Sequence, residues 1–387
     1  MKTSCAVQMS HLASEFANNG NEVTVITPTS NIFDKSSILK PKNYDIFRFR
    51  SLKISDISFV RRALNELLLP FCFISAYYFS SIKKKNFDYI IWYSPSIFFS
   101  PIIWFLKKRF QSKTYLILRD IFPEWTIDLG ILKDGVVYRF LRSIAKIQYK
   151  VADKIGIQSK SNFYVIQDYV QKNKVEVLNN WTSNSDAHHH ESLNIDAFNN
   201  DNSNQKTIIY LGNMGIAQDM YSLLEIAEIF QKREFKGIFL FIGRGTEVQQ
   251  LKNITKNKKI KNVKFFDEID PKYVPSLLKD CSAGLISLDP RHKTHNIPGK
   301  FISYIESSLP VIARINSNSD LEEIITKNQI GLVYSDNNLN EFAMKISNML
   351  DNDNLLRKQS ERARNLFLKE FTTESAYTQI MKFYDEF

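Results

Sequence analysis

Short apolar runs alternate with helical patterns along almost the whole chain, and this alternation constrains the fold more than any other feature. It is typical of a parallel sheet with helices on both faces, because parallel strands need a crossover between them. The predicted strands are residues 22–27, 89–93, 115–118, 154–158 and 175–178 in the first half, and 207–211, 237–242, 263–266, 283–287, 310–313 and 330–333 in the second. We therefore predict an α/β protein built from doubly wound parallel sheets.

Two domains are expected, because 387 residues exceed the size of one ordinary core. Residues 184–206 are rich in Asn, Ser and Asp and are predicted to form a linker. The domains are then residues 1–183 and 207–370, and a final helix, 371–387, is expected to cross back to the first domain. Doubly wound sheets bind ligands at the carboxyl ends of their strands, so we expect a cleft where these ends face each other.

The start of the chain is unusual for a doubly wound domain. A helix is predicted over residues 8–18, and no apolar strand precedes it. The first strand of the N-terminal domain is therefore expected to be missing. Three explanations remain open: a truncated sequence, a start misassigned upstream, or another segment that fills the gap.

Composition bounds the class of protein. A hydrophobic content of 44% and a charged content of 24% are those of a globular protein. Cys5, Cys72 and Cys281 lie far apart and show neither disulfide nor metal-ligand spacing, which makes a reducing, cytoplasmic environment the default. Neither a secretory signal nor an apolar run of membrane-spanning length is recognised.

Positive charge is concentrated in the first half. Residues 1–183 hold 26 Lys and Arg against 14 Asp and Glu, whereas the remainder holds 25 against 27. The basic groups 61–62, 83–85 and 107–109 flank the apolar runs 67–71, 77–79 and 97–106. Such flanking favours an anionic membrane surface, at roughly 1 kcal/mol for each basic residue near the lipid. We expect peripheral binding at the inner face of the cytoplasmic membrane and no nucleic-acid partner; the alternative is core helices with solvated ends.

Three loops carry candidate chemistry. Residues 212–219 (Gly-Asn-Met-Gly-Ile-Ala-Gln-Asp) and 243–247 (Gly-Arg-Gly-Thr-Glu) each lie between a predicted strand and a helix, where glycine lets backbone N–H groups approach a phosphate. A third loop enters a helix that carries Lys300, and Glu306 is expected near the same helix start. These side chains suit a phosphate and a ribose diol. The alternative is an ordinary αβ unit in which Lys300, Glu306 and Arg244 are solvated.

A metal site is not expected. The triplet His188 to His190 lies in the predicted linker and is interpreted as a solvated loop. No other cluster of His, Cys, Asp and Glu has metal-ligand spacing, so helix N-termini together with Lys and Arg are expected to bind a diphosphate.

In order and spacing, residues 212–219, 243–247, 262–266, 277–285 and 298–313 resemble the nucleotide-sugar half of retaining glycosyltransferases of family 4, which have the two-domain GT-B fold. The first half agrees over residues 11–13, 19–27, 119–125, 152–154 and 178–181. Segments 119–125, 128–130 and 212–220 are most similar to N-acetyl-L-fucosaminyl transferases of bacterial O-antigen and capsule assembly. The resemblance implies a UDP-sugar donor, a polyprenyl-diphosphate-linked glycan acceptor bound by the first domain, and retention of anomeric configuration.

The chain departs from the family pattern at the donor loops. Many members carry two glutamates separated by seven residues; here the second is Glu306, and Pro298 takes the place of the first. Asn213 and Gln218 stand where many members have Arg and Lys. Lys300 and Arg244 are then the candidates for neutralising the leaving diphosphate. The predicted donor-binding residues are Gly212, Asn213, Gly215, Gln218, Arg244, Lys300 and Glu306.

In the first domain, Arg119 and Asp120 follow the predicted strand 115–118. Asp120 or Glu124 is expected to accept a hydrogen bond from the acceptor hydroxyl, and Arg119 to bind an acceptor phosphate. Alternatively, Asp120 caps the helix that follows. With Lys300, these three residues form the predicted catalytic set. The rival functions are a non-catalytic GT-B protein that binds a nucleotide sugar or a partner transferase, and a nucleotide-sugar 2-epimerase.

Overall fold

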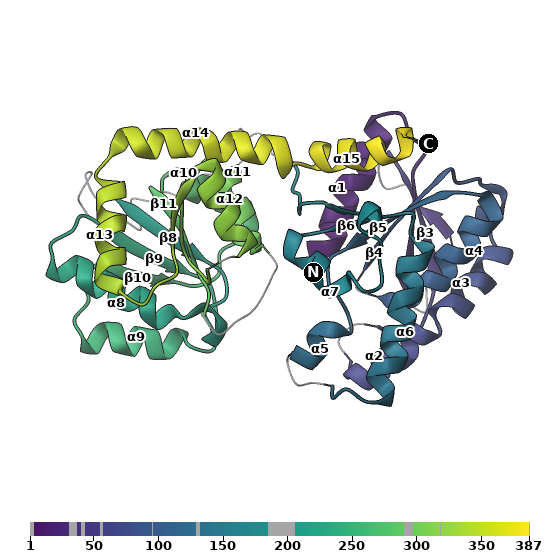
Figure 1. Ribbon diagram of the computed structural model, residues 1–387, viewed down its shortest axis with the longest axis horizontal. Helices are drawn as coiled ribbons and strands as arrows, with labels where there is room; N and C mark the ends of the chain where they lie inside the picture. Colours follow the sequence, from purple (N-terminus) through teal and green to yellow (C-terminus); the bar gives the residue numbers. More distant parts are fainter. Residues whose placement is uncertain are drawn as a thin grey trace. The chain divides into compact units, whose positions relative to one another are not determined.

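The computed structural model describes residues 4–30, 37–39, 43–54, 57–94, 96–128, 132–184, 206–289, 297–317 and 319–386. The chain divides into two compact units. Unit 1 comprises Met1–Ser183 and Thr373–Phe387, and unit 2 comprises Asn184–Thr372. Figure 1 shows both units as α/β layers. Most of the predicted linker lies outside the described residues.

Unit 2 is built on one parallel sheet of six strands, in the order β10-β9-β8-β11-β12-β13. The strands are β8 (Thr207–Leu211), β9 (Ile238–Ile242), β10 (Val263–Phe266), β11 (Ala283–Ser287), β12 (Val311–Arg314) and β13 (Gly331–Tyr334). The first strand, β8, lies inside the sheet, between β9 and β11. The strand order therefore reverses direction at β8, which is where doubly wound sheets bind ligands.

Helices cover both faces of this sheet (Figure 1). They are α8 (Met220–Lys232), α9 (Val248–Asn257), α10 (Val274–Lys279), α11 (Gly299–Glu306), α12 (Asp320–Asn328), α13 (Leu339–Leu350) and α14 (Asp353–Glu370). Alternate strand residues supply the two cores: Ile209 packs with α10, α11, α12 and α14, whereas Ile208 and Tyr210 pack with α8, α9 and α13. Successive residues of a strand point to opposite faces of the sheet, and helices cover both faces. The central strands are therefore apolar along their whole length.

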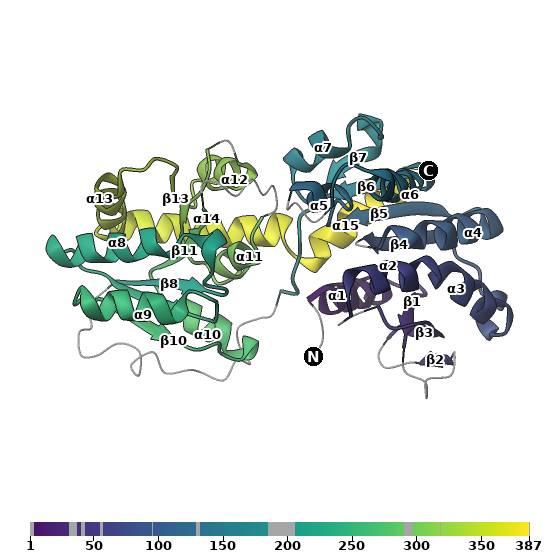
Figure 2. The ribbon, with the colours of Figure 1, turned by 90° about the horizontal axis from the view of Figure 1, so that it is seen from below.

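Unit 1 contains two separate sheets (Figure 2). One has the order β1-β3-β2, with β1 (Thr24–Thr29) parallel to β3 (Asp45–Arg50) and β2 (Ser37–Leu39) antiparallel to β3. The other is the parallel sheet β4-β5-β6-β7, formed by β4 (Tyr89–Ser94), β5 (Lys113–Leu118), β6 (Lys154–Ile157) and β7 (Val175–Val177). In the part of the chain that is described, β1 and β4 each lie at an edge of their sheet.

Helices also cover both faces of the four-stranded sheet of unit 1. The helices of this unit are α1 (Ser4–Asn18), α2 (Phe59–Leu67), α3 (Leu69–Tyr78), α4 (Ser100–Phe110), α5 (Glu124–Asp128), α6 (Val136–Val151), α7 (Lys160–Ile166) and α15 (Thr373–Asp385). Leu116 and Leu118 pack with α3, α4 and α6, whereas Tyr115 and Ile117 pack with α1 and α15. The last helix of the chain therefore belongs to the core of the first unit.

The predicted α/β fold with parallel, doubly wound sheets is confirmed. Strands β8, β10 and β11 have the predicted bounds, and most others differ by one or two residues. The sequence analysis did not predict β2 and β3. In β3, Phe47 and Phe49 are buried while the intervening Arg48 is half-buried, so the apolar run is interrupted by charge. Among the described helices, none is long and apolar enough to cross a membrane.

Candidate functional site

The loops after β8 and β9 pack backbone against backbone at the carboxyl edge of the unit 2 sheet. Gly212 and Gly243 have φ values of +116° and +143°, which residues with a side chain rarely adopt. A Cβ atom on Gly243 would overlap the carbonyl oxygen of Gly212, and one on Gly245 would overlap that of Met214. The amide of Met214 donates to the carbonyl of Arg244 at 2.8 Å. These glycines therefore fix the turn after β8 against its neighbour.

Asn213 and Gln218 hold the turn closed from within. The Gln218 Oε1 atom accepts hydrogen bonds from Asn213 Nδ2 at 3.1 Å and from the backbone amide of Gly215 at 3.2 Å. Residues Ile216–Gln218 form the 3-10 turn η6, which leads into α8. The two amide side chains thus bond to each other. We call residues 212–218 the donor turn.

Lys300 lies in the first turn of α11 and is partly buried. Its ammonium lies 3.5 Å from the centroid of the Tyr210 ring and 3.9 Å from the position that a Cβ atom would occupy on Gly212. Burial lowers the pKa of Lys300 to about 7. In the structure, Lys300 therefore lies beside the first glycine of the donor turn.

Tyr304 fixes α11 at this position. Its hydroxyl accepts from the amide of Leu211 and lies 3.2 Å from the carbonyls of Ile209 and Leu285, to which it can donate its single hydrogen. Its ring lies where a Cβ atom on Gly284 would be. Because Tyr304 follows Lys300 by four residues on one helix face, anchoring the tyrosine positions the lysine.

Glu306 is not near the start of the helix, and that expectation was wrong. It is the last residue of α11, six residues after Lys300, or about 9 Å along the axis and about 120° around it. The helix has eight residues because Leu309 and Pro310 must precede β12. Arg364 Nη1 donates to the backbone carbonyl of Glu306 at 2.8 Å. A ribose contact by Glu306 stays a prediction, and it requires a donor that extends along the helix.

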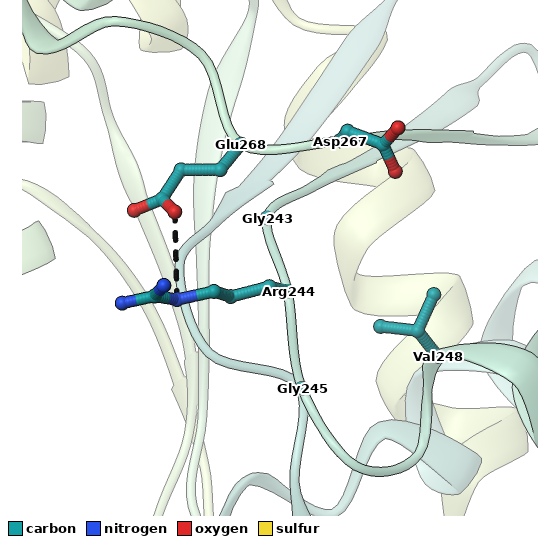
Figure 3. Close-up of a pocket in the computed structure, with 6 residues that line it drawn as sticks. All are labelled: Gly243, Arg244, Gly245, Val248, Asp267 and Glu268. Carbon is teal, nitrogen blue, oxygen red and sulfur yellow. Dashed lines mark ion pairs between the residues drawn. The ribbon is translucent and has the colours of Figure 1, made fainter.

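Arg244 borders a separate, shallow pocket of about 360 Å³ at the ends of β9 and β10 (Figure 3). The pocket is lined by Gly243, Arg244, Gly245, Val248, Asp267 and Glu268. The Arg244 side chain is 78% exposed and forms an ion pair of 3.4 Å with Glu268. In Figure 3, both side chains lie on the same side of the loop. Of the two positively charged residues predicted to bind the donor, Arg244 is therefore more exposed than Lys300.

In unit 1, Arg119 and Asp120 follow β5 at the carboxyl edge of the sheet. Arg119 Nη1 donates to Gln8 Oε1 at 2.6 Å and to the Tyr93 hydroxyl at 2.9 Å, so α1 and β4 position the guanidinium. Burial raises the pKa of Asp120, although the positive charge of Arg119 opposes this shift. A carboxylate with a raised pKa at a strand end is a candidate for proton transfer.

Glu124 contacts a helix of the same unit. It is the first residue of α5, and its carboxylate lies 4.0 Å from Arg142 Nε of helix α6. Burial, and to a lesser extent the charge of Glu124, raise the pKa of Tyr149 on α6. The guanidinium of Arg142 lies over the ring of Tyr169 at 4.8 Å. Glu124 therefore contributes to the packing of α5 on α6, and its role toward an acceptor stays a prediction.

Sequence analysis missed two charged residues beside the donor turn. Arg314, the last residue of β12, is buried and forms an ion pair with Asp219, the residue that follows η6. The signal available was a basic residue at the end of an apolar strand, where interior strands rarely carry charge. Among the described residues, no group of three or more His, Cys, Asp and Glu could hold a metal ion, and His188 to His190 lie outside those residues.

Comparisons with known proteins agree with this architecture. Residues 192–366 match the family model for Glycosyl transferases group 1. The chain is similar to the probable glycosyltransferase WbjE of Pseudomonas aeruginosa, with 22% identity over 233 residues, 58% of this chain and 57% of the relative. It is also similar to the putative colanic acid biosynthesis glycosyl transferase WcaI of Escherichia coli K12, with 25% identity over 229 residues and 56% of each chain. The chain thus spans little more than half the length of these relatives.

Solved structures share the fold at lower identity. Sucrose-phosphate synthase of Thermosynechococcus elongatus has a TM-score of 0.71 at 14% identity, covering 99% of this chain and 93% of its own. The Anabaena protein Alr3699/HepE, solved in complex with UDP and glucose, has a TM-score of 0.65 at 12% identity, covering 100% and 96%. These likenesses extend over both units. The fold of the chain is therefore GT-B, and its residues 192–366 match the Glycosyl transferases group 1 family.

Proposed function

We propose that the chain is a retaining glycosyltransferase of family 4 that transfers a sugar, N-acetyl-L-fucosamine, from a UDP-sugar to a polyprenyl-diphosphate-linked glycan of O-antigen or capsule assembly. The observation that carries the proposal is the position of Lys300. Its ammonium lies beside the first glycine of a turn whose backbone is fixed by close glycine contacts. That turn precedes helix α8, and a helix N-terminus next to a cation binds a phosphate favourably.

The donor side of the proposal rests on unit 2. HepE was solved with UDP, and its fold is shared along the full length of this chain. We place the diphosphate at the donor turn and Lys300, and the nucleoside toward the ends of β9 and β10, where the shallow pocket of Figure 3 lies. Asn213 and Gln218 stand where many members of the family have Arg and Lys. In this arrangement, backbone amides and Lys300 bind the diphosphate instead. No metal is required in this arrangement.

The chemistry asks the protein to stabilise a leaving diphosphate. As the bond from the anomeric carbon to the diphosphate oxygen breaks, negative charge accumulates on that oxygen. The acceptor hydroxyl attacks from the same face and transfers its proton to the leaving diphosphate, which gives retention. Lys300 and the donor turn contribute by binding the developing charge more strongly than they bind the ground state.

The acceptor side rests on unit 1. Asp120 lies at the carboxyl edge of the four-stranded sheet with a raised pKa, and Arg119 lies beside it with its guanidinium oriented by Gln8 and Tyr93. We assign Asp120 to the acceptor hydroxyl and Arg119 to an acceptor phosphate. Glu124 remains a candidate for the same hydroxyl only if α5 moves away from α6.

A lipid-linked acceptor also calls for contact with a membrane surface. Helices α3 and α4 pack through Tyr77 and Phe105, whose ring centroids lie 5.2 Å apart. They expose Phe71, Phe79 and Trp104, with 72%, 91% and 55% of their surface accessible. Exposed aromatic rings beside Lys and Arg suit the interface of an anionic bilayer.

Not every basic residue of this region is available to lipid. Lys85 bonds to Glu22 at 2.7 Å and to Asp45 at 2.8 Å, and Lys107 bonds to Asp153 at 2.7 Å. Through these ion pairs, Lys85 and Lys107 connect separate segments of unit 1, so their charges are already paired within the protein. Lys84, Lys108 and Arg109 are exposed and form the basic part of the proposed membrane surface.

Release of UDP with and without a polyprenyl-diphosphate-linked acceptor tests the proposal. A panel of UDP-sugars, followed by mass spectrometry of the lipid product, identifies the donor. Acceptor-dependent release supports a glycosyltransferase. Binding of UDP without turnover on any acceptor would indicate a non-catalytic GT-B protein, a reading that the absence of the two donor-loop cations favours. Conversion of the sugar without an acceptor would indicate a 2-epimerase.

A further inference from the structure

Arg314 is a buried arginine at the carboxyl end of an interior strand. Only 6% of the residue is exposed, and its Nη1 atom donates to Asp219 Oδ2. Its Nε atom is buried and has no hydrogen-bond partner. A buried guanidinium is costly unless it is paired, so the ion pair with Asp219 offsets the cost of burying Arg314 at this edge of the sheet.

Asp219 connects this arginine to the donor turn. It is the residue directly after η6 and the N-cap residue of α8, with a φ of +43°, a conformation that favours Gly, Asn or Asp. Its Oδ2 atom also accepts a hydrogen bond from the Ser222 hydroxyl at 2.7 Å. The carboxylate therefore occupies the helix N-terminus next to which we place the donor diphosphate.

The surroundings of this ion pair are mostly polar and buried. Ser287 is the register partner of Arg314 on β11, and its hydroxyl is buried without a partner. The amide of Asp289 donates to the carbonyl of Ala217 at 2.9 Å, which joins the end of β11 to the donor turn. Burial and the negative charge of Asp219 raise the pKa of Glu247. Without Arg314, the charge of Asp219 would add to that of Glu247 with no ion pair to offset it.

We propose that Arg314 is a positioning residue of the donor site, which holds the donor turn through Asp219 and cancels the negative charge that Asp219 brings next to the diphosphate. The inference rests on the proposed function, because it requires a nucleoside diphosphate at the donor turn. Asn213 and Gln218 supply no charge there. Arg314, at the end of β12, therefore matters by balancing the charge of Asp219, which no side chain of the donor turn itself can do.

The test measures UDP affinity by titration calorimetry in Arg314→Met, Asp219→Gly and the double variant, at low and high salt. Arg314→Met should weaken UDP binding by about tenfold, the effect of one uncompensated charge at roughly 10 Å in a medium of effective dielectric about 20. Asp219→Gly in the same chain should restore the affinity, since it removes the carboxylate and suits the positive φ. A merely structural pair would not show this rescue, nor a loss that shrinks at high salt.

Two further variants complete the design. Lys206→Met removes an ion pair of 2.6 Å with Asp353, at the opposite end of strand β8, and should leave UDP affinity unchanged. Asp219→Asn retains a hydrogen-bonding group toward Arg314 and should tighten UDP binding at low salt, which keeps the test valid if Arg314→Met does not fold. If the wild type binds UDP and Arg314→Met binds it equally well, this inference is wrong and the proposed function is unaffected. The same holds if Asp219→Asn binds UDP no more tightly than the wild type. Absence of wild-type binding overturns the proposed function as well.

Discussion

The ammonium of Lys300 lies 3.5 Å from the centroid of the Tyr210 ring, above the last residues of the strand that leads into the donor turn. The ring face attracts a cation, yet burial lowers the pKa of Lys300 to about 7. Lys300 therefore loses its charge near neutral pH. An anion bound beside it would raise its pKa again, so charge on Lys300 and donor binding should be coupled.

This coupling predicts a pH dependence of UDP binding. Below pH 7 the ammonium is charged, and above pH 7 binding must first return a proton to it, so UDP affinity should fall as pH rises from 7 to 9.5. Calorimetry at pH 8 in buffers of different ionisation enthalpy should detect proton uptake on binding. Stability should change in the opposite sense, because an unfolded lysine titrates near 10.4; the unfolded chain binds the extra proton between pH 7 and 10.4, and stability rises across that window.

Substitution of Lys300 gives the kinetic counterpart. Lys300→Ala should cost roughly 2–4 kcal/mol of transition-state stabilisation, seen in kcat/KM. Lys300→Arg keeps the charge at every pH and should flatten the pH dependence of UDP binding. Glu306→Gln should mainly raise the Kd for UDP. Unchanged kinetics in Lys300→Ala would remove the lysine from the site, and unchanged binding in Glu306→Gln would remove the glutamate.

A second prediction concerns the contact between the two glycine loops. Gly243→Ala places a Cβ atom on the carbonyl of Gly212 at a φ of +143°, which should cost about 1–3 kcal/mol or more and displace the donor turn. Melting temperature and UDP affinity should both decrease. Gly135→Ala is the control, because the nearest atom to its added Cβ lies at 3.8 Å. Wild-type UDP affinity in Gly243→Ala would show that the turn does not depend on this contact.

A third prediction separates the two candidate carboxylates of unit 1, Asp120 and Glu124. Asp120→Asn should lower kcat with the lipid-linked acceptor and leave UDP affinity intact, since Asp120 belongs to the other unit. Glu124→Gln loses the contact with Arg142 and should lower the melting temperature more than kcat. In the wild type, the acid limb of the pH–rate profile should lie above that of an ordinary aspartate, because burial raises the pKa of Asp120. The reverse pattern in the two variants would exchange their roles.

A fourth prediction addresses the membrane surface. Co-sedimentation with vesicles that contain anionic lipid should fall as salt rises, and Lys84→Gln, Lys108→Gln and Arg109→Gln together should reduce it. Phe79→Ser should reduce the part that salt does not remove. Lys107→Gln is the matched control: it breaks the ion pair with Asp153 and should lower stability while lipid binding changes little. Equal binding to neutral and anionic vesicles would contradict the electrostatic part of the proposal.

The strands of unit 2 could be predicted closely because each is a short apolar run between turn residues, as parallel strands buried on both faces require. The donor turn and Lys300 could be found for a related reason. The turn directly follows strand β8, and Lys300 lies on the helix that precedes strand β12. Strand β3 was missed because Arg48 interrupts its apolar residues, although Phe47 and Phe49 alternate as a half-buried strand should.

The contact between Asp219 and Arg314 could not be predicted from local pattern. Ninety-five positions separate the two residues, and they meet because the strand order places β11 beside β8 and β12 beside β11. Glu306 shows the converse error. Its residue type suggested a ligand, but the position of a side chain along and around a helix depends on where the helix begins, and an error of two residues already moves it to the opposite face.

Helix α15 constrains the order in which the two units can finish folding. Phe383 and Tyr384, near its end, pack with Leu12 and Tyr115, and the Tyr384 hydroxyl lies 3.3 Å from the carbonyl of Ile90, 294 positions earlier. During translation, one face of the four-stranded sheet in the first unit can be covered only by α1 until the whole of the second unit has left the ribosome. The second unit, continuous in sequence, can finish folding first. A nascent chain stalled after α14 should therefore expose apolar surface from the domain that was made earlier.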